Sequence, residues 1–210
     1  MVSIDNLPPD FRTFLVRSGP MGVRNRNHEI VSALTEMDYT IVIVSTNVPA
    51  ELQIEQFERE GIDTSSLFFI DMITAYAKGK KQKNTDQIKY IDRPGDLTKA
   101  GILITGCINE HQGEKVAFMF DTINTMLIYS NQLSVSRFVH FVVNKLRLAD
   151  LRGFFLMVEK SIDSGLVADF EMLMDMSVPR DEPVTTLINS EIKEKVGVSE
   201  ENSYGEFDLN

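Results

Sequence analysis

Residues 18–30 read SGPMGVRNRNHEI, and this stretch decides how the first part of the chain folds. An apolar run, FLV at residues 14–16, precedes it, and apolar residues with helical spacing follow over residues 30–34. A strand, a glycine-rich turn and a helix in this order are typical of the phosphate-binding corner of a parallel α/β sheet. The lysine and the hydroxyl residue that such a loop uses are absent. The stretch therefore predicts a fold and leaves open whether a nucleotide site exists.

The composition of the 210 residues is that of a globular domain, with 43% apolar and 25% charged residues. The net charge of −10 argues against a nucleic-acid binder, because phosphate contacts need clustered lysine and arginine. The single cysteine, Cys107, excludes an intrachain disulfide and a cysteine-based metal cluster. The N-terminal residues resemble no signal peptide, and no apolar run reaches the roughly 20 residues of a membrane helix. We expect a cytoplasmic protein without a membrane segment.

Apolar strands alternate with helices along the chain. We predict strands over residues 11–17, 40–45, 67–71, 115–121 and 153–158, with short strands at 88–91 and 174–178. We predict helices over residues 27–36, 49–60, 97–109, 124–129, 134–148 and 166–173. Ser134 is expected to cap its helix, and Gly61 to end the helix before it. This alternation predicts a three-layer α/β/α domain with a mostly parallel sheet over residues 11–178, between a lead-in segment, 1–10, and a polar acidic tail, 179–210.

The turn matches the phosphate-loop pattern GxxxxGK[ST] only in part. Gly19 takes the first position, and Gly22 is an additional glycine inside the turn. Arg24 stands at the second glycine, Asn25 at the lysine and Arg26 at the hydroxyl residue. A tight turn without a ligand explains the same residues. The two arginines can hold an anion at the helix N-terminus, or they can be solvated surface charges.

A second part of the pattern is the strand KVAFMFD, which ends in Asp121 and is followed by Thr122. In nucleotide-hydrolysing sheets an acidic residue at this point holds the Mg²⁺ water shell, and we expect this strand to lie beside the first one. An aspartate that caps a turn is the alternative. The candidate nucleotide-binding residues are therefore Gly19, Pro20, Gly22, Arg24, Asn25, Arg26 and Asp121.

The order of these segments resembles the archaeal KaiC-like branch of the RecA superfamily. The resemblance covers residues 11–178 and rests on SGPMG, IVIVSTNVPAE, LFFID, KVAFMFDTINTMLIY, RFVHFVVNKLR and GFFLMVEK, in that order. It implies a RecA-like ATPase core that binds ATP with Mg²⁺ and assembles as an oligomer. It also implies a polar sensor residue after the fifth strand, where this chain has Glu159 and Lys160.

The departures from that family concern its chemistry. The catalytic acidic pair of the family would fall on Thr46 and Asn47, neither of which can act as a base. With the loop lysine and hydroxyl also missing, the sequence predicts a catalytically inactive, regulatory or scaffolding homologue without catalytic residues or a required cofactor. Its expected partners are proteins, as a homo-oligomer or with a paralogous ATPase, and signal transduction is one setting for such a protein.

Two rival functions remain open from the sequence. An atypical ATPase or kinase would use ATP and Mg²⁺, with Asp121 holding the metal and the residues around Arg24 replacing the lysine. A DNA-associated recombinase paralogue would need basic loops, and only the segment KGKKQKN at residues 78–84 offers one. The acidic balance of the chain disfavours this second rival.

Overall fold

The computed structural model describes residues 11–111, 113–159, 162–182 and 184. The predicted lead-in segment and residues 183 and 185–210 of the predicted tail lie outside the described residues. No helix of the described chain is both long and apolar enough to cross a bilayer.

Within the described residues, one sheet of seven strands forms the centre of the domain, and every pairing in it is parallel. The strands are β1 (Thr13–Ser18), β2 (Thr40–Ser45), β3 (Leu67–Asp71), β4 (Ile88–Tyr90), β5 (Val116–Phe120), β6 (Arg152–Val158) and β7 (Met176–Val178). Their order across the sheet is β4-β3-β2-β5-β6-β1-β7. The strands are apolar on both sides because both faces are covered, as in other parallel sheets.

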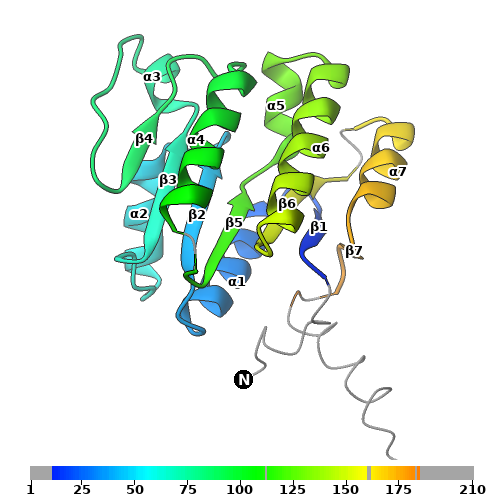
Figure 1. Cartoon of the computed structure of the whole chain (residues 1–210), viewed down its shortest axis with the longest axis horizontal. Helices are drawn as coiled ribbons and strands as arrows, with labels where there is room; N and C mark the ends of the chain where they lie inside the picture. The colour runs from blue at the N-terminus through cyan, green and yellow to red at the C-terminus, as the bar shows by residue number, and fades with distance from the viewer. Residues whose placement is uncertain (1–10, 112, 160–161, 183, 185–210) are drawn as a thin grey trace, which may run out of the picture.

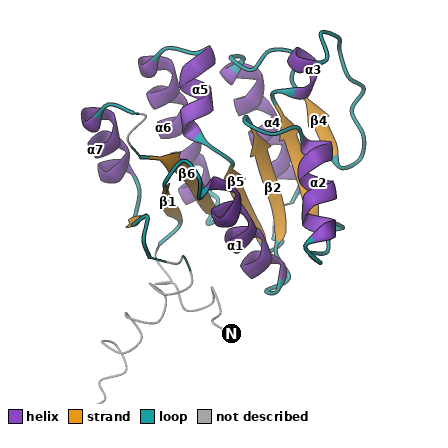
Figure 2. Ribbon diagram, turned by 180° about the vertical axis from the view of Figure 1, so that it is seen from behind, coloured by secondary structure: helices purple, strands orange, loops and turns teal. Residues whose placement is uncertain are grey.

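Helices cover both faces of the sheet, which confirms the predicted three-layer architecture (Figures 1 and 2). The helices are α1 (Val23–Thr35), α2 (Ala50–Arg59), α3 (Thr74–Ala77), α4 (Leu97–Glu110), α5 (Ile123–Tyr129), α6 (Gln132–Leu148) and α7 (Ser164–Leu173). One core cluster joins α1 and α2 to one face, and a second joins α4, α5, α6 and α7 to the other. Alternate residues of one strand serve opposite clusters, as Val16 and Leu15 do in β1.

The expected neighbour of the first strand was wrong. β5, the strand that precedes Asp121, pairs with β2 and β6, and β6 lies between it and β1. Strand β6 can take this central position because its residues Gly153–Met157 are buried on both faces. The apolar pattern predicts that a strand is buried, but not which strands flank it.

Three helix starts differ from the prediction by two residues or more, and one of them is that of α7, which begins at Ser164 instead of residue 166. α1 begins at Val23, four residues before the expected start, because the turn after β1 is short. α6 begins at Gln132, and its cap is Asn131, whose side-chain oxygen accepts from the backbone N–H of Ser134 at 2.9 Å. Asn and Ser are equally good caps, so residue type alone does not choose between Asn131 and the predicted Ser134. Gly61 follows α2 with a φ of +79°, the left-handed conformation expected after a helix end.

Candidate functional site

The turn between β1 and α1 contains only four residues, 19–22. The backbone N–H of Gly22 donates to the carbonyl of Gly19 at 2.9 Å, which closes the turn on itself. A Cβ atom at Gly22 would lie 2.8 Å from the hydroxyl oxygen of Ser18, so a side chain at this position would clash. The glycine is therefore explained by the tightness of the turn, without reference to a ligand.

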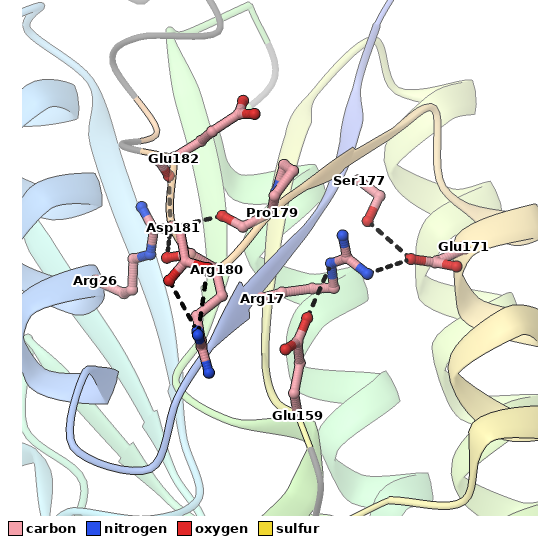
Figure 3. A network of polar contacts seen from close by, with 9 residues as sticks. All are labelled: Arg17, Arg26, Glu159, Glu171, Ser177, Pro179, Arg180, Asp181 and Glu182. Atoms are coloured by element: carbon pink, nitrogen blue, oxygen red, sulfur yellow. Dashed lines mark hydrogen bonds and ion pairs between the residues drawn. The ribbon is translucent and has the colours of Figure 1, made fainter.

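Arg26 lies in the second turn of α1 and is buried, with 7% of its surface exposed. Its guanidinium donates to three backbone carbonyls of the segment after β7: Pro179 at 2.7 Å, Arg180 at 2.7 Å and Glu182 at 2.5 Å. It also forms an ion pair with Glu29 at 3.0 Å. Figure 3 shows Arg26 beside this segment. The side chain predicted to face a phosphate thus fastens residues 179–182, which we assigned to the tail, against α1.

The other predicted residues of the turn point elsewhere. Arg24 is exposed and pairs with Glu60 of the segment after α2, and Glu60 also lies 3.5 Å from the ring of His28. The hydrogen bond from Arg24 holds the pKa of the Glu60 carboxyl below its usual range. Pro20 and Asn25 are exposed.

A cavity of about 540 Å³ lies over this turn. Its walls come from the turn, from α1 and from the segment after β7. Arg180 lies over Gly19, so that a Cβ there would meet its Cδ at 3.3 Å. The acidic side chains in the lining, Glu29, Asp181 and Glu182, oppose a bound anion.

Asp121 follows β5 and is fully buried, with 1% of its surface exposed. One carboxylate oxygen accepts from the backbone N–H and hydroxyl of Thr46 at 2.9 and 2.5 Å, and from the backbone N–H of Thr122 at 2.7 Å. The other accepts from the N–H of Asn47 at 3.0 Å and of Val48 at 3.4 Å. Burial raises the pKa of this carboxyl, and the hydrogen bonds act in the opposite direction. The carboxylate orders the loop between β2 and α2.

Asp71, at the end of β3, orders the loop between β3 and α3 in the same way. No role was predicted for it from the sequence. Its carboxylate accepts from the backbone N–H of Ala50 at 2.8 Å, which begins α2, and from those of Ile73 and Thr74 at 2.9 and 2.8 Å. The hydroxyl of Thr74 adds a bond at 2.6 Å. The sequence feature that could have identified Asp71 is the one that identified Asp121, an aspartate at the end of an apolar strand.

Thr46 and Asn47, the positions at which the family would have its catalytic acidic pair, lie in the loop between β2 and α2. Thr46 is buried and donates its hydroxyl to Asp121, whereas Asn47 is exposed. Glu159, at the predicted sensor position after β6, pairs with Arg17 of β1 at 3.3 Å, and Arg17 also reaches Glu171 of α7 (Figure 3). Lys160 lies outside the described residues.

The lysine-rich segment at residues 78–84 lies beside α3 and β4. Lys78 forms an ion pair with Glu51 at 3.0 Å, and Lys81 with Asp92 at 3.4 Å. Lys80 and Lys83 are exposed. Within the described ranges, no three His, Cys, Asp or Glu side chains gather as a metal site. Cys107 is a half-buried free thiol whose pKa is raised by burial.

The all-parallel sheet, with helices on both faces, has the RecA-like α/β/α fold of solved structures that align with it. The chain belongs to the family of unknown function DUF7504, whose family model matches residues 13–179. Comparison with curated proteins gives no match.

Solved structures share the fold. The uncharacterized protein PH0321 from Pyrococcus horikoshii, solved in complex with an unknown peptide, aligns with a TM-score of 0.60 and 14% identity over 80% of this chain and 76% of its own. Flagellar accessory protein FlaH from Methanocaldococcus jannaschii aligns with a TM-score of 0.56 and 14% identity over 81% and 71%. The KaiC-like protein PH0186 from Pyrococcus horikoshii OT3 gives 0.56 and 13% over 80% and 69%. At these identities the likeness establishes the fold alone.

Proposed function

We propose that this chain is a non-hydrolysing member of the RecA-like fold that acts through protein–protein contacts, as a regulatory or scaffolding protein. The observation that carries the proposal is the state of Asp121. Both of its carboxylate oxygens accept hydrogen bonds from Thr46, Asn47 and their neighbours, so a Mg²⁺ water shell would have to displace contacts that order the fold.

The turn after β1 supports the same proposal. The turn has four residues and is closed by a hydrogen bond from the Gly22 N–H to the Gly19 carbonyl, so it is shorter than the phosphate-loop pattern requires. The turn contains no lysine, and the Arg26 guanidinium already donates hydrogen bonds to backbone carbonyls of the segment after β7. We interpret the turn as a degenerate phosphate loop of the KaiC-like branch. The peptide bound to PH0321 is the kind of partner that we expect here.

The test is calorimetric titration of the purified chain with ATP and ADP, with and without Mg²⁺, together with an ATP turnover assay. We expect no heat of binding at millimolar nucleotide and no phosphate release. Robust turnover would refute the proposal.

A second candidate, an atypical ATP-binding protein, is favoured by the cavity of about 540 Å³ over the turn, into which Arg180 projects. If heat is observed, Arg180→Ala and Asp121→Asn separate the possibilities. Loss of binding in Arg180→Ala alone would indicate an anion held without metal. Loss of the Mg²⁺ dependence in Asp121→Asn would indicate a working metal site, while Asp86→Asn, at an exposed position, serves as the matched control.

A further inference from the structure

An apolar groove with a cavity of about 890 Å³ runs between α4 and α6, below the turn that joins α5 to α6. Ile102 of α4 and Phe141 of α6 line it and are 65% and 41% exposed, and Tyr129 of α5 lies at one end. Leu133, 59% exposed, extends the apolar surface along α6. Large apolar side chains gathered in one groove are typical of an interaction surface, whereas single ones are ordinary.

The charges along this groove are unusual for the chain. Helix α6 contains no acidic residue, although the whole chain has a net charge of −10; its Arg147 pairs with Asp175, and Arg137 and Asp96 are the charged residues of the groove lining. Arg137 lines the groove and is exposed, and no described residue forms an ion pair or hydrogen bond with it. The ammonium of Lys145 lies 5.8 Å from the centre of the Phe141 ring. The groove thus combines apolar side chains with Arg137, which pairs with no described carboxylate, and it has Lys145 beside its Phe141 ring.

Residues 199–210, SEENSYGEFDLN, have the complementary chemistry. They contain four acidic residues and no basic one, and three large apolar or aromatic residues, Tyr204, Phe207 and Leu209. Aromatic anchors in an apolar pocket contribute most of the binding energy in many interfaces. Carboxylates beside an unpaired arginine add charge-assisted hydrogen bonds.

The stretch of chain before residue 199 is long enough for residues 199–210 to reach the groove. Residues 185–198 separate the buried Val184 from this segment, and 14 extended residues span roughly 45 Å. A compact domain of this size has a radius of gyration of about 16 Å, so the segment can reach the groove around the β7 edge of the sheet. An intramolecular segment is present at an effective concentration of about a millimolar, and a modest affinity suffices for docking.

We propose that residues 199–210 dock into the α4–α6 groove of their own chain, with Phe207 and Leu209 beside Phe141 and Ile102, and with Glu206 or Asp208 facing Arg137. This inference does not depend on nucleotide binding, and it stands whether or not ATP is bound at the β1–α1 turn.

The test uses the full chain, which contains no tryptophan. Phe141→Trp places one fluorophore in the groove, and acrylamide quenching measures its exposure. We expect a shielded indole in this parent, and a more strongly quenched, red-shifted one after Phe207→Ser with Leu209→Ser. The matched control is Val196→Ser with Val198→Ser, which removes two apolar residues outside the segment and should leave quenching unchanged. Ile102→Trp repeats the measurement if Phe141→Trp does not fold.

Charge is tested separately. Glu206→Gln with Asp208→Asn should increase quenching in part and remove its dependence on salt, whereas Glu191→Gln with Glu194→Gln should not. Equal quenching in the parent and in the Phe207→Ser, Leu209→Ser variant would overturn the proposal. Shielding that disappears on dilution would also overturn it, because a second copy would then supply the segment.

Discussion

The loop after β2 and the segment after β7 both follow strands at the same edge of the parallel sheet, yet opposite charges order them. In the first, the Asp121 carboxylate accepts from backbone N–H groups of Thr46, Asn47 and Thr122. In the second, the Arg26 guanidinium donates to backbone carbonyls of residues 179–182. Loops that follow parallel strands carry backbone groups without ladder partners, and each must find one.

The difference lies in what each charge holds. Asp121 joins two loops that flank the neighbouring strands β2 and β5, so it belongs to the centre of the sheet. Arg26 joins α1 to a segment after the edge strand β7, which pairs with β1 alone and contains three residues. We infer that the Asp121 loops open only with the whole fold, whereas the Arg26 segment can detach by itself.

The largest expected effect is that of Asp121→Ala. The substitution leaves the N–H groups of Thr46, Asn47 and Thr122, two of them on buried residues, without this acceptor, and it should lower the free energy of unfolding by about 3–5 kcal/mol. Urea unfolding followed by circular dichroism measures the loss. Asp86→Ala, at an exposed position, is the control and should cost no more than about 0.5 kcal/mol. A small loss in both variants would mean that water replaces the carboxylate in the loops.

The second largest loss of unfolding free energy is expected for Arg26→Ala, and Arg24→Ala is the control from the same helix. Losing the buried guanidinium should cost about 2–4 kcal/mol, because three carbonyls and Glu29 lose their donor. Losing the exposed Arg24 pair with Glu60 should cost at most about 1 kcal/mol.

Amide hydrogen exchange shows which part of the structure is destabilised in Arg26→Ala. Peptides that contain residues 176–182 should exchange faster in Arg26→Ala, while those from β2 and β5 stay protected. Faster exchange throughout the sheet would contradict the inference that this segment detaches by itself.

Most of the fold could be predicted from the sequence because it depends on local pattern. The runs TIVIVS and LFFID are buried on both faces, as their composition indicates, and correspond to β2 and β3. The order of strands could not be read this way. β6 lies between β1 and β5 through contacts between residues far apart in the chain, such as Leu15 with Phe155 and Phe120 with Phe155.

The candidate site was predicted in location but not in its contacts. The sequence placed Arg24 and Arg26 together in the turn before the predicted helix, with equal charge, and nothing local distinguishes them. In the structure they have different partners. Arg26 donates hydrogen bonds to the segment at residues 179–182, more than 150 positions later, whereas Arg24 pairs with Glu60. Asp71 and Asp121 share one signal, a strand-ending aspartate, which indicates an ordered loop as readily as a metal ligand.

The smallest effect concerns pH, and it compares Asp121 with Asp175 near the start of β1. The Asp175 carboxylate accepts from the backbone N–H groups of Arg12 and Thr13, and from Arg147. Partial burial opposes its ionisation, but the hydrogen bonds from Arg147, Arg12 and Thr13 together lower its pKa below 3.8. Its stabilisation is therefore present above pH 3.8 and is lost as the pH falls through the folded-state value.

Asp121 should show the opposite slope. Burial raises its pKa above 3.8, so its contribution is greatest below that pH and declines as the pH rises through the folded-state value. Unfolding free energies of the parent, Asp175→Asn and Asp121→Asn, measured by urea between acidic and neutral pH, test both signs. The gap between the parent and Asp175→Asn should narrow toward low pH, and the gap to Asp121→Asn should narrow toward neutral pH. Slopes of the same sign would show that the six hydrogen bonds to the Asp121 carboxylate outweigh its burial.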